Sequence, residues 1–514
     1  MNCDWASARA RLSPARTAIY DLDRDRGYDY LAMLRRVAHL FGLVQHLGAR
    51  RGDRVAILAK NGMAHVDLFL LAGYGGVTLV PLNWRLPLQE LLPLVEAARV
   101  RQLFYGPEFA QTAASLAARK HLKAVALGPA GEAYERALAQ AVPARPQPAE
   151  EGDVAMLLFT GGTTGIAKGV RVTHRQMFWN AVNTVTSWEL SAQDCAPVFT
   201  PFYHTGGYHV LLSPLYHAGG QSLIAESFSP ALARRAIRDH GVSVLFLVPT
   251  MFQSLIEEGL DPGEMASVRF AISGGAACPP WVEDRFGALG VRFKQGYGLT
   301  EVGPNCFALA LEEAHAHPGS VGVPVYHLEV RIVGDQGEAM PAGEPGELWL
   351  RGPTVADGYE GRPEETAAVF DADGFCHTGD LATQDAQGFV RIVGRKKEMY
   401  ISGGENVYPI EVENALYAHP AVALAAVAGV PHPHWGEVGV AWVQLREGTG
   451  TSQADLMAFL GARLARYKLP KQLIVLPALP LTTAGKVAKE ELRRGYLAGT
   501  NAEEGVGIRD EPGR

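Results

Sequence analysis

The 514-residue sequence predicts an α/β fold. We expect a large N-terminal domain of parallel-rich sheets covered by helices, with an antiparallel subdomain, and then a small α+β C-terminal domain. Strand-like and helix-like segments alternate through the first two thirds of the chain. Short strand-like segments separated by turn residues follow, and a mixed pattern fills the C-terminal part. The chain is also too long for a single hydrophobic core.

The alternation is clearest in the middle of the chain. Residues 230–240 have a helical pattern, with Ser229 as the expected N-cap and Pro230 in the first turn. Two apolar, β-branched runs follow at 242–248 and 268–272. Strand, helix and strand in this order predict parallel strands that are buried on both faces by helices.

Later segments predict different local structure. Residues 329–333, 346–350 and 389–393 are strand-like and are separated by Gly, Asp and Pro turns, which favours an antiparallel subdomain. From residue 395 onward, a small α+β unit is expected, with helices at 410–417 and 454–464 and strands at 422–427 and 438–445. Ser452 and Asp455 are spaced to cap the second of these helices. The tail 499–514 lacks core residues and is expected to be disordered.

Composition excludes several classes of protein. Hydrophobic residues make up 47% and charged residues 20%, as in ordinary globular proteins. A net charge of −7 without a polybasic block argues against nucleic-acid binding. The five cysteines form no C-x-x-C pair, which argues against a disulfide framework or a structural zinc site. No signal-peptide h-region or transmembrane stretch is apparent, because the apolar run 68–82 is short and interrupted by glycines. We expect a cytoplasmic protein.

The segment 160–169 is the most informative motif. It follows the strand-like run 154–159 and predicts a phosphate cradle, because closely spaced glycines turn backbone N–H groups inward while hydroxyls and a lysine add donors and charge. It is not a Walker A motif, since Lys168 follows Ala167. The alternative is a Gly/Thr-rich surface turn. The candidate phosphate ligands are Thr160, Gly161, Gly162, Thr163, Thr164, Gly165 and Lys168.

Two further segments are typical of a nucleotide site. Residues 295–301 place an aromatic ring, a hydroxyl and a carboxylate in one glycine-rich loop after a strand, which suits a base, a phosphate and Mg²⁺. A strand-ending turn with a core tyrosine is the alternative. Residues 273–276 are small and end another strand, where a purine could lie against backbone.

Two more segments complete the set. His377-Thr378-Gly379-Asp380, followed by Arg395, offers a carboxylate that could accept from the two hydroxyls of a ribose, although Thr-Gly-Asp is also a common turn. Residues 480–486 form a polar loop that ends in Lys486. Taken alone, such a lysine is more often simply solvated.

Together, the five motifs resemble those of the AMP-forming acyl-CoA synthetase branch of the acyl-adenylate-forming enzymes. The resemblance extends from about residue 25 to about residue 495. Gly161 stands where the family usually has Ser or Thr, and Ala167 where it usually has Pro. Both departures leave the backbone cradle possible. The resemblance implies an ATP-dependent acid–thiol ligase that uses Mg²⁺ and coenzyme A and converts a carboxylic acid to acyl-CoA through acyl-AMP, releasing AMP and pyrophosphate.

The same resemblance implies roles for individual residues. It implies that the catalytic residues are Lys486, His204, Thr300 and Glu301, and that Glu301 is also the metal ligand. Besides the phosphate loop, ATP and AMP binding falls to Gly274, Gly275, Ala276, Gln295, Gly296, Tyr297, Thr300, Asp380 and Arg395. The coenzyme A tunnel would include Ser402, Gly403 and Gly404. The acyl pocket would include Tyr203, His204, Gly206, Gly207, Tyr208, Phe246 and Leu299.

The resemblance also implies the domain organisation. Residues 1–394 would form the N-terminal adenylate-forming domain, 395–397 the hinge with Lys397 at its pivot, and 398–498 a mobile C-terminal domain. In this family the mobile domain exchanges the Lys486 loop for the coenzyme A loop between the two half-reactions.

The acid itself is less well defined. The mostly apolar acyl pocket favours a medium- or long-chain fatty acid, with a benzoate- or cinnamate-like acid as the alternative. A stand-alone adenylating enzyme that loads a carrier protein is a second alternative, and a nucleotide-binding regulatory module without catalysis is a third. The expected partners are small molecules, namely the acid, ATP and coenzyme A, and a homodimer is compatible with the sequence.

Overall fold

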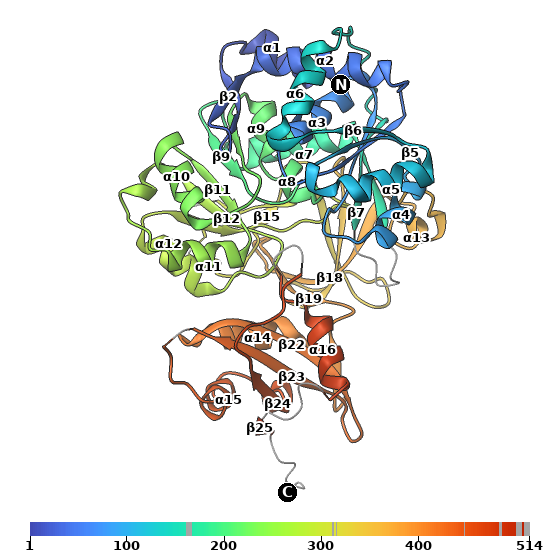
Figure 1. The fold of residues 1–514 in the computed structure, drawn as a ribbon. Helices are drawn as coiled ribbons and strands as arrows, with labels where there is room; N and C mark the ends of the chain where they lie inside the picture. Colours follow the sequence, from blue (N-terminus) through green and yellow to red (C-terminus); the bar gives the residue numbers. More distant parts are fainter. Residues whose placement is uncertain are drawn as a thin grey trace, which may run out of the picture.

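The computed structural model confirms the predicted α/β fold with a large N-terminal part and a smaller C-terminal part (Figure 1). It describes residues 1–160, 167–310, 313–314, 316–446, 448–482, 486–499 and 506–507.

Parallel sheets form the N-terminal part. The largest has the strand order β6-β5-β3-β4-β7-β8, in which only β7 and β8 pair antiparallel. Its strands are β3 (Arg54–Leu58), β4 (Thr78–Pro81), β5 (Val100–Tyr105), β6 (Lys123–Ala126), β7 (Val154–Thr160) and β8 (Lys168–Thr173). A second sheet has the order β2-β1-β10-β9, with strands β1 (Thr17–Asp21), β2 (Arg26–Asp29), β9 (Cys195–Val198) and β10 (Gln221–Ile224). A third is fully parallel and contains β11 (Val244–Leu247), β12 (Phe270–Ser273) and β13 (Arg292–Gln295).

Helices cover these sheets, as the alternating pattern predicts. Ser229 accepts a hydrogen bond from the Leu232 N–H and caps helix α10, so the expected helix start is confirmed. The apolar run after Met63 is a fully buried helix, α3, that leads into β4. The helices are α1 (Trp5–Leu12), α2 (Tyr30–His46), α3 (Met63–Gly75), α4 (Leu88–Ala97), α5 (Ala110–Lys120), α6 (Glu132–Gln140), α7 (His174–Ser187), α8 (Thr205–His209), α9 (Leu212–Ala218), α10 (Pro230–His240), α11 (Pro249–Glu257), α12 (Pro280–Ala288) and α13 (Pro363–Ala367).

An antiparallel sheet follows, again as predicted. Its order is β16-β17-β18-β19, with strands β16 (Glu329–Val333), β17 (Gly346–Arg351), β18 (Phe375–Gln384) and β19 (Val390–Arg395). A short ladder of β14 (Phe307–Ala308) with β15 (Val323–Pro324) precedes it.

The C-terminal part packs helices against a mixed sheet. Ser452 and Asp455 form a reciprocal capping box at the start of α15, as their spacing predicts. Val506 and Gly507 of the tail pair antiparallel with β24. The elements are β20 (Tyr400–Ser402), β21 (Glu405–Val407), β22 (Val422–His432), β23 (Gly436–Leu445), β24 (Gln472–Val475), β25 (Val506–Gly507), α14 (Pro409–Tyr417), α15 (Gln453–Gly461) and α16 (Lys489–Leu497).

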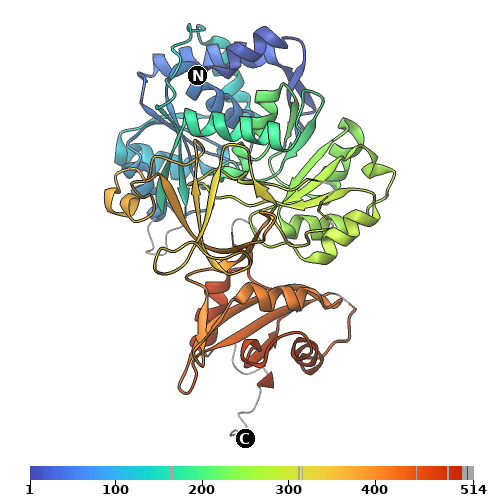
Figure 2. The same cartoon turned by 180° about the vertical axis from the view of Figure 1, so that it is seen from behind.

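Both views show the C-terminal part, in orange and red, lying on one side of the N-terminal part and joined to it after β19 (Figure 2). The expected hinge 395–397 begins at the last residue of β19 and precedes the first strand of the C-terminal sheet, β20. The exact domain boundaries stay a prediction. Within the described residues, no helix has the length and apolar character needed to span a membrane.

An ion cluster holds α2, α3 and α6 together inside the N-terminal part. Arg36 Nη2 lies 2.8 Å from Asp67 Oδ2 and 2.7 Å from Glu135 Oε1. Tyr134 Oη donates a further hydrogen bond of 2.9 Å to Asp67. The Asp67 side chain is completely buried, so its charge depends on these partners.

We expect Arg36→Met to lower the free energy of unfolding by about 3–5 kcal/mol, because it leaves a buried carboxylate without its cation. Urea unfolding followed by tryptophan fluorescence would measure the change. Arg51→Met is the matched control, since Arg51 pairs with Glu150 and Asp153 at the surface, and it should leave the urea midpoint nearly unchanged. Equal midpoints for the two variants would contradict this account.

Candidate active site

One large cavity of about 1260 Å³ lies between the N-terminal part and the C-terminal part. It opens at the carboxyl ends of β7, β12 and β13, where ligands bind in open α/β sheets. Most of the predicted site residues meet there. Those that line it are Thr160, Lys168, Tyr203, His204, Gly206, Phe246, Gly274, Gly275, Gly296, Leu299, Thr300, Glu301, Asp380, Arg395, Lys397 and Lys486.

Other predicted residues lie elsewhere. Gly161, Gly162, Thr163, Thr164 and Gly165 fall outside the described residues. Among the described ones, Ala276, Gln295, Tyr297, Gly207 and Tyr208 do not line the cavity. The ring of Tyr208, expected in the acyl pocket, is fully buried in the N-terminal core, 5.4 Å from the Phe69 ring and 4.7 Å from that of Phe202. A Cβ built on Gly207 would lie 2.8 Å from the Pro201 carbonyl oxygen and 2.9 Å from Phe202 Cα, so this position has no room for a side chain.

One end of the cavity is built on the β7–β8 hairpin, where the sequence predicts a phosphate cradle. Thr160 and Lys168 are paired across this hairpin, so both flank the loop between the strands. Lys168 Nζ lies 5.1 Å from the centroid of the Tyr359 ring. Tyr359, which sequence reasoning missed, donates a 2.9 Å hydrogen bond to Glu301 Oε1. No motif surrounds Tyr359 in the sequence, so only the fold reveals it.

Glu301 fits the expected magnesium ligand. Burial raises the pKa of its carboxyl, while the hydrogen bond from Tyr359 and the charge of Arg395 oppose that rise. The described residues contain no group of three or more His, Cys, Asp or Glu side chains placed to hold a metal. Mg²⁺ commonly takes one or two carboxylates and completes its shell with phosphate oxygens and water. Bound there, Mg²⁺ would neutralise phosphate charge.

The antiparallel sheet supplies a fixed carboxylate. Asp380 on β18 faces Arg395 on β19, and Arg395 Nε lies 3.1 Å from Asp380 Oδ1. Tyr297 Oη donates a 2.6 Å hydrogen bond to Asp380 Oδ2. Tyr297 therefore stands behind the carboxylate and orients it. With one partner on each oxygen, Asp380 keeps lone pairs free to accept from ribose hydroxyls.

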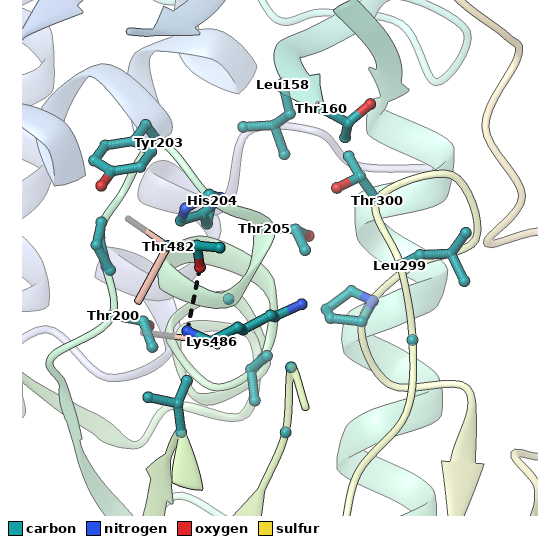
Figure 3. Close-up of a pocket in the computed structure, with 18 of the residues that line it drawn as sticks. Leu158, Thr160, Thr200, Tyr203, His204, Thr205, Leu299, Thr300, Thr482 and Lys486 are labelled. Carbon is teal, nitrogen blue, oxygen red and sulfur yellow. Dashed lines mark hydrogen bonds between the residues drawn. The ribbon is translucent and has the colours of Figure 1, made fainter. Parts of the chain in front are cut away.

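Lys486 reaches the cavity from the C-terminal part. Its backbone N–H donates a 3.2 Å hydrogen bond to Thr482 Oγ1, and its side chain lies below His204 and Thr205, opposite Leu299 and Thr300 (Figure 3). A Cβ built on Gly275 would lie 3.5 Å from Lys486 Cε, so the lysine passes directly over the β12 edge. Burial and the charge of Arg395 lower the pKa of the Lys486 ammonium.

The predicted coenzyme A loop is outside this cavity. Ser402, Gly403 and Gly404 form the turn of the β20–β21 hairpin, where both glycines have positive φ and the Gly403 N–H donates to the Trp435 carbonyl. The structure thus places Lys486 inside the cavity and this turn away from it.

Two profiles of known protein families match most of the chain. A sequence profile described as AMP-binding enzyme matches residues 6–360, and a second, described as AMP-binding enzyme C-terminal domain, matches residues 411–486. The chain belongs to the AMP-binding enzyme family. Within it, the chain is an AMP-forming acyl-CoA ligase that acts through an acyl-adenylate and uses ATP, Mg²⁺ and coenzyme A.

Individual relatives cover almost the whole chain. It is 39% identical to a feruloyl-CoA synthase of an Amycolatopsis species, over 96% of this chain and 98% of the relative. ATP-bound MatB from Rhodopseudomonas palustris is similar in structure, with a TM-score of 0.91 and 29% identity over 97% of this chain and 100% of that one. An o-succinylbenzoate coenzyme A synthetase from Bacillus subtilis, in complex with ATP and magnesium, has a TM-score of 0.85 and 28% identity over 95% and 99% of the two chains.

We expect Lys486→Met to slow acyl-adenylate formation by about 100-fold or more, because it removes a positive charge from the site where two anions must approach each other. ATP–pyrophosphate exchange would measure this step. Thioester formation from supplied acyl-adenylate should be spared. Lys396→Met is the control, since Lys396 lines the same cavity but pairs with Asp335 and Glu347, and it should change exchange little. Equal loss in both half-reactions would contradict a role confined to adenylation.

His204 is expected to act as a neutral side chain. Burial, with the nearby charges of Lys486 and Arg85, lowers the pKa of its imidazole to about 4. The ring is then uncharged throughout pH 5.5–8, so His204→Phe should leave the pH profile of adenylation unchanged over that interval. If the rate of the unsubstituted enzyme changes with pH near 6.5 and this change is absent from the variant, His204 titrates at its ordinary pKa.

Proposed function

We propose that this protein is an aryl-CoA ligase, which joins an aromatic carboxylic acid to coenzyme A through an aryl-adenylate. The main support is the aromatic character of the cavity beyond His204. Flat, polarisable walls suit a ring, which gains offset or edge-to-face contacts that an alkyl chain does not. These walls are made by Trp84, Trp188, Phe199, Tyr203, Phe228 and Phe246.

The names of the relatives agree with an aromatic acid. Both feruloyl-CoA synthase and o-succinylbenzoate coenzyme A synthetase are named for aromatic acyl groups. The fatty acid favoured by the sequence alone is thus the weaker candidate, and the aryl alternative fits better. The apolar character that suggested an alkyl chain comes largely from ring side chains.

The proposed reaction gives a role to several polar and charged residues of the cavity. Lys168 and Thr160 would hold the β- and γ-phosphates, Thr300 the α-phosphate, and Asp380 with Arg395 the ribose. Lys486 would lie between the acid's carboxylate and the α-phosphate. The carboxylate oxygen then attacks the α-phosphorus and pyrophosphate leaves, so the lysine offsets the repulsion between the two anions.

The second half-reaction would require coenzyme A at the same carbonyl. Its thiol displaces AMP from the aryl-adenylate and forms the thioester. The Ser402–Gly404 turn lies outside the cavity in the present arrangement. We propose that it approaches when Lys486 withdraws. All five cysteines are buried and unpaired, which supports the cytoplasmic location that we propose.

A panel of acids tests the proposal. We expect benzoate-, phenylacetate- and cinnamate-type acids to give higher kcat/KM in a pyrophosphate-release assay than octanoate or palmitate, by about tenfold or more, because the ring contacts contribute about 1.5 kcal/mol. Release should depend on added coenzyme A over many turnovers. Higher kcat/KM for the alkyl acids would restore the fatty-acid alternative, and release unaffected by coenzyme A would favour carrier-protein loading.

A further inference from the structure

The inner end of the acyl cavity carries two buried polar side chains that the reaction does not use. Asn305 lines the cavity and is only 4% exposed. Lys294 is 5% exposed and lies behind the ring of Trp188, which lines the cavity. Their surroundings are otherwise apolar, as the cavity here is formed by Trp188, Val210, Phe246 and Ile272. Buried polar groups normally have hydrogen-bond partners, so each of these two needs an explanation.

The Asn305 amide is half satisfied. Its Nδ2 donates to Thr184 Oγ1 at 2.8 Å and to the carbonyls of His209 and Val210 at 3.2 and 3.0 Å. These acceptors fix the orientation of the amide, because exchanging its two ends would set one carbonyl oxygen against others. The remaining atom, Oδ1, is buried and has no hydrogen-bond partner among the described residues. Asn305 Oδ1 can therefore accept a hydrogen bond from a bound substrate.

Lys294 supplies positive charge at the same end. On the β11–β12–β13 sheet, Phe246, Ile272 and Lys294 occupy one register row, and the first two line the cavity. The Lys294 ammonium lies 4.5 Å from the Trp188 ring centroid and 4.6 Å from that of Phe270. No carboxylate of a described residue forms an ion pair with it. Burial lowers the pKa of Lys294 to about 7, so the uncompensated charge is costly.

Trp188 connects the two groups. Its ring lines the cavity and covers the Lys294 ammonium, and its Nε1 donates a 3.2 Å hydrogen bond to the carbonyl of Phe307, two residues beyond Asn305. Lys294 is the register partner of Ile272, and because β12 rises about 3.3 Å per residue, this level lies about 7 Å along the strand from Gly274. The acid's carboxylate would lie at the Gly274 end beside Lys486, and its far substituent near Asn305.

We infer that Asn305 and Lys294 form a specificity site for a hydroxyl group on the ring of the aromatic acid. The hydroxyl would donate to Asn305 Oδ1, and its oxygen would lie in the positive potential of Lys294. Asn305 would touch the substrate, whereas Lys294 would act from behind Trp188 as a positioning residue. The inference rests on the proposed aryl-CoA ligase function and adds the substituent that the acid must carry.

The experiment compares acids that differ only at the ring. We would measure kcat/KM by coenzyme A-dependent pyrophosphate release for cinnamate, its 3- and 4-hydroxy derivatives and its 4-methoxy derivative. A methoxy group keeps the oxygen but cannot donate. We expect at least one hydroxy acid to exceed cinnamate and the methoxy acid by about tenfold or more, as one hydrogen bond to a buried acceptor is worth about 1.5 kcal/mol.

Two variants test which residues cause the preference for a hydroxy acid. Asn305→Leu should reduce the ratio of hydroxy acid to cinnamate to within about threefold, and Lys294→Met should reduce it partly, while the KM for ATP stays the same in both. Asn183→Leu is the matched control, since Asn183 is an equally buried asparagine whose side chain does not line the cavity, and it should keep the full ratio. A ratio is insensitive to loss of folded enzyme.

The outcomes separate the two levels of the proposal. Turnover of alkyl acids without turnover of any aromatic acid would overturn the proposed function itself. Turnover of aromatic acids with equal kcat/KM for cinnamate and its hydroxy derivatives would overturn only the specificity site. If Asn305→Leu keeps the preference for hydroxy acids, the specificity site is also overturned. If the methoxy acid has the same kcat/KM as the hydroxy acid, the site does not recognise a hydrogen-bond donor, which overturns it too.

Discussion

An excess of positive charge around one cavity governs the arrangement of this site. Among the described residues that line the cavity, the cationic side chains outnumber the carboxylates. The cations are Lys60, Arg85, Lys168, Arg395, Lys396, Lys397 and Lys486, and the carboxylates are Glu226, Glu301 and Asp380. Like charges gathered around one cavity repel one another unless counter-charges arrive. A triphosphate and a carboxylate supply them, so substrates complete the electrostatics that the fold leaves unbalanced.

This constraint explains why the cavity lies between two parts of the chain. Lys486 comes from the C-terminal part, whereas Asp380 and Arg395 belong to the antiparallel sheet that leads to it. On the far side, Lys489 on α16 pairs with Glu398, directly after the hinge, and with Glu413 on α14, and so ties the Lys486 segment to both. A lysine that enters with a separate body can be presented for one half-reaction and withdrawn for the next without rebuilding the N-terminal sheets.

The motifs could be predicted from the sequence because each is a short run, and three of them, 160–169, 273–276 and 295–301, begin at the carboxyl ends of the strands β7, β12 and β13. In parallel sheets such ends meet at one edge, so segments distant in sequence converge without any knowledge of strand order. Single residues could not be predicted in the same way. Tyr359 acts through its contact with Glu301, and Lys294 matters because β13 pairs with β12 in one particular register. Tyr208 shows the converse: only tertiary packing reveals that its ring lies against Phe69 in the core.

Recognition of the acid and activation of ATP share one rigid loop. Glu301 and Asn305 are four residues apart, and between them the chain folds back so that the Leu299 N–H donates to the Gly303 carbonyl. A Cβ on Gly298 would lie 2.3 Å from the carbonyl carbon of Pro304, so only glycine permits this approach. A misplaced acid at Asn305 would therefore strain the same segment that carries Thr300 and Glu301. Because such a segment has little freedom to adjust, selectivity for the ring is expected in the rate of adenylation as well as in binding.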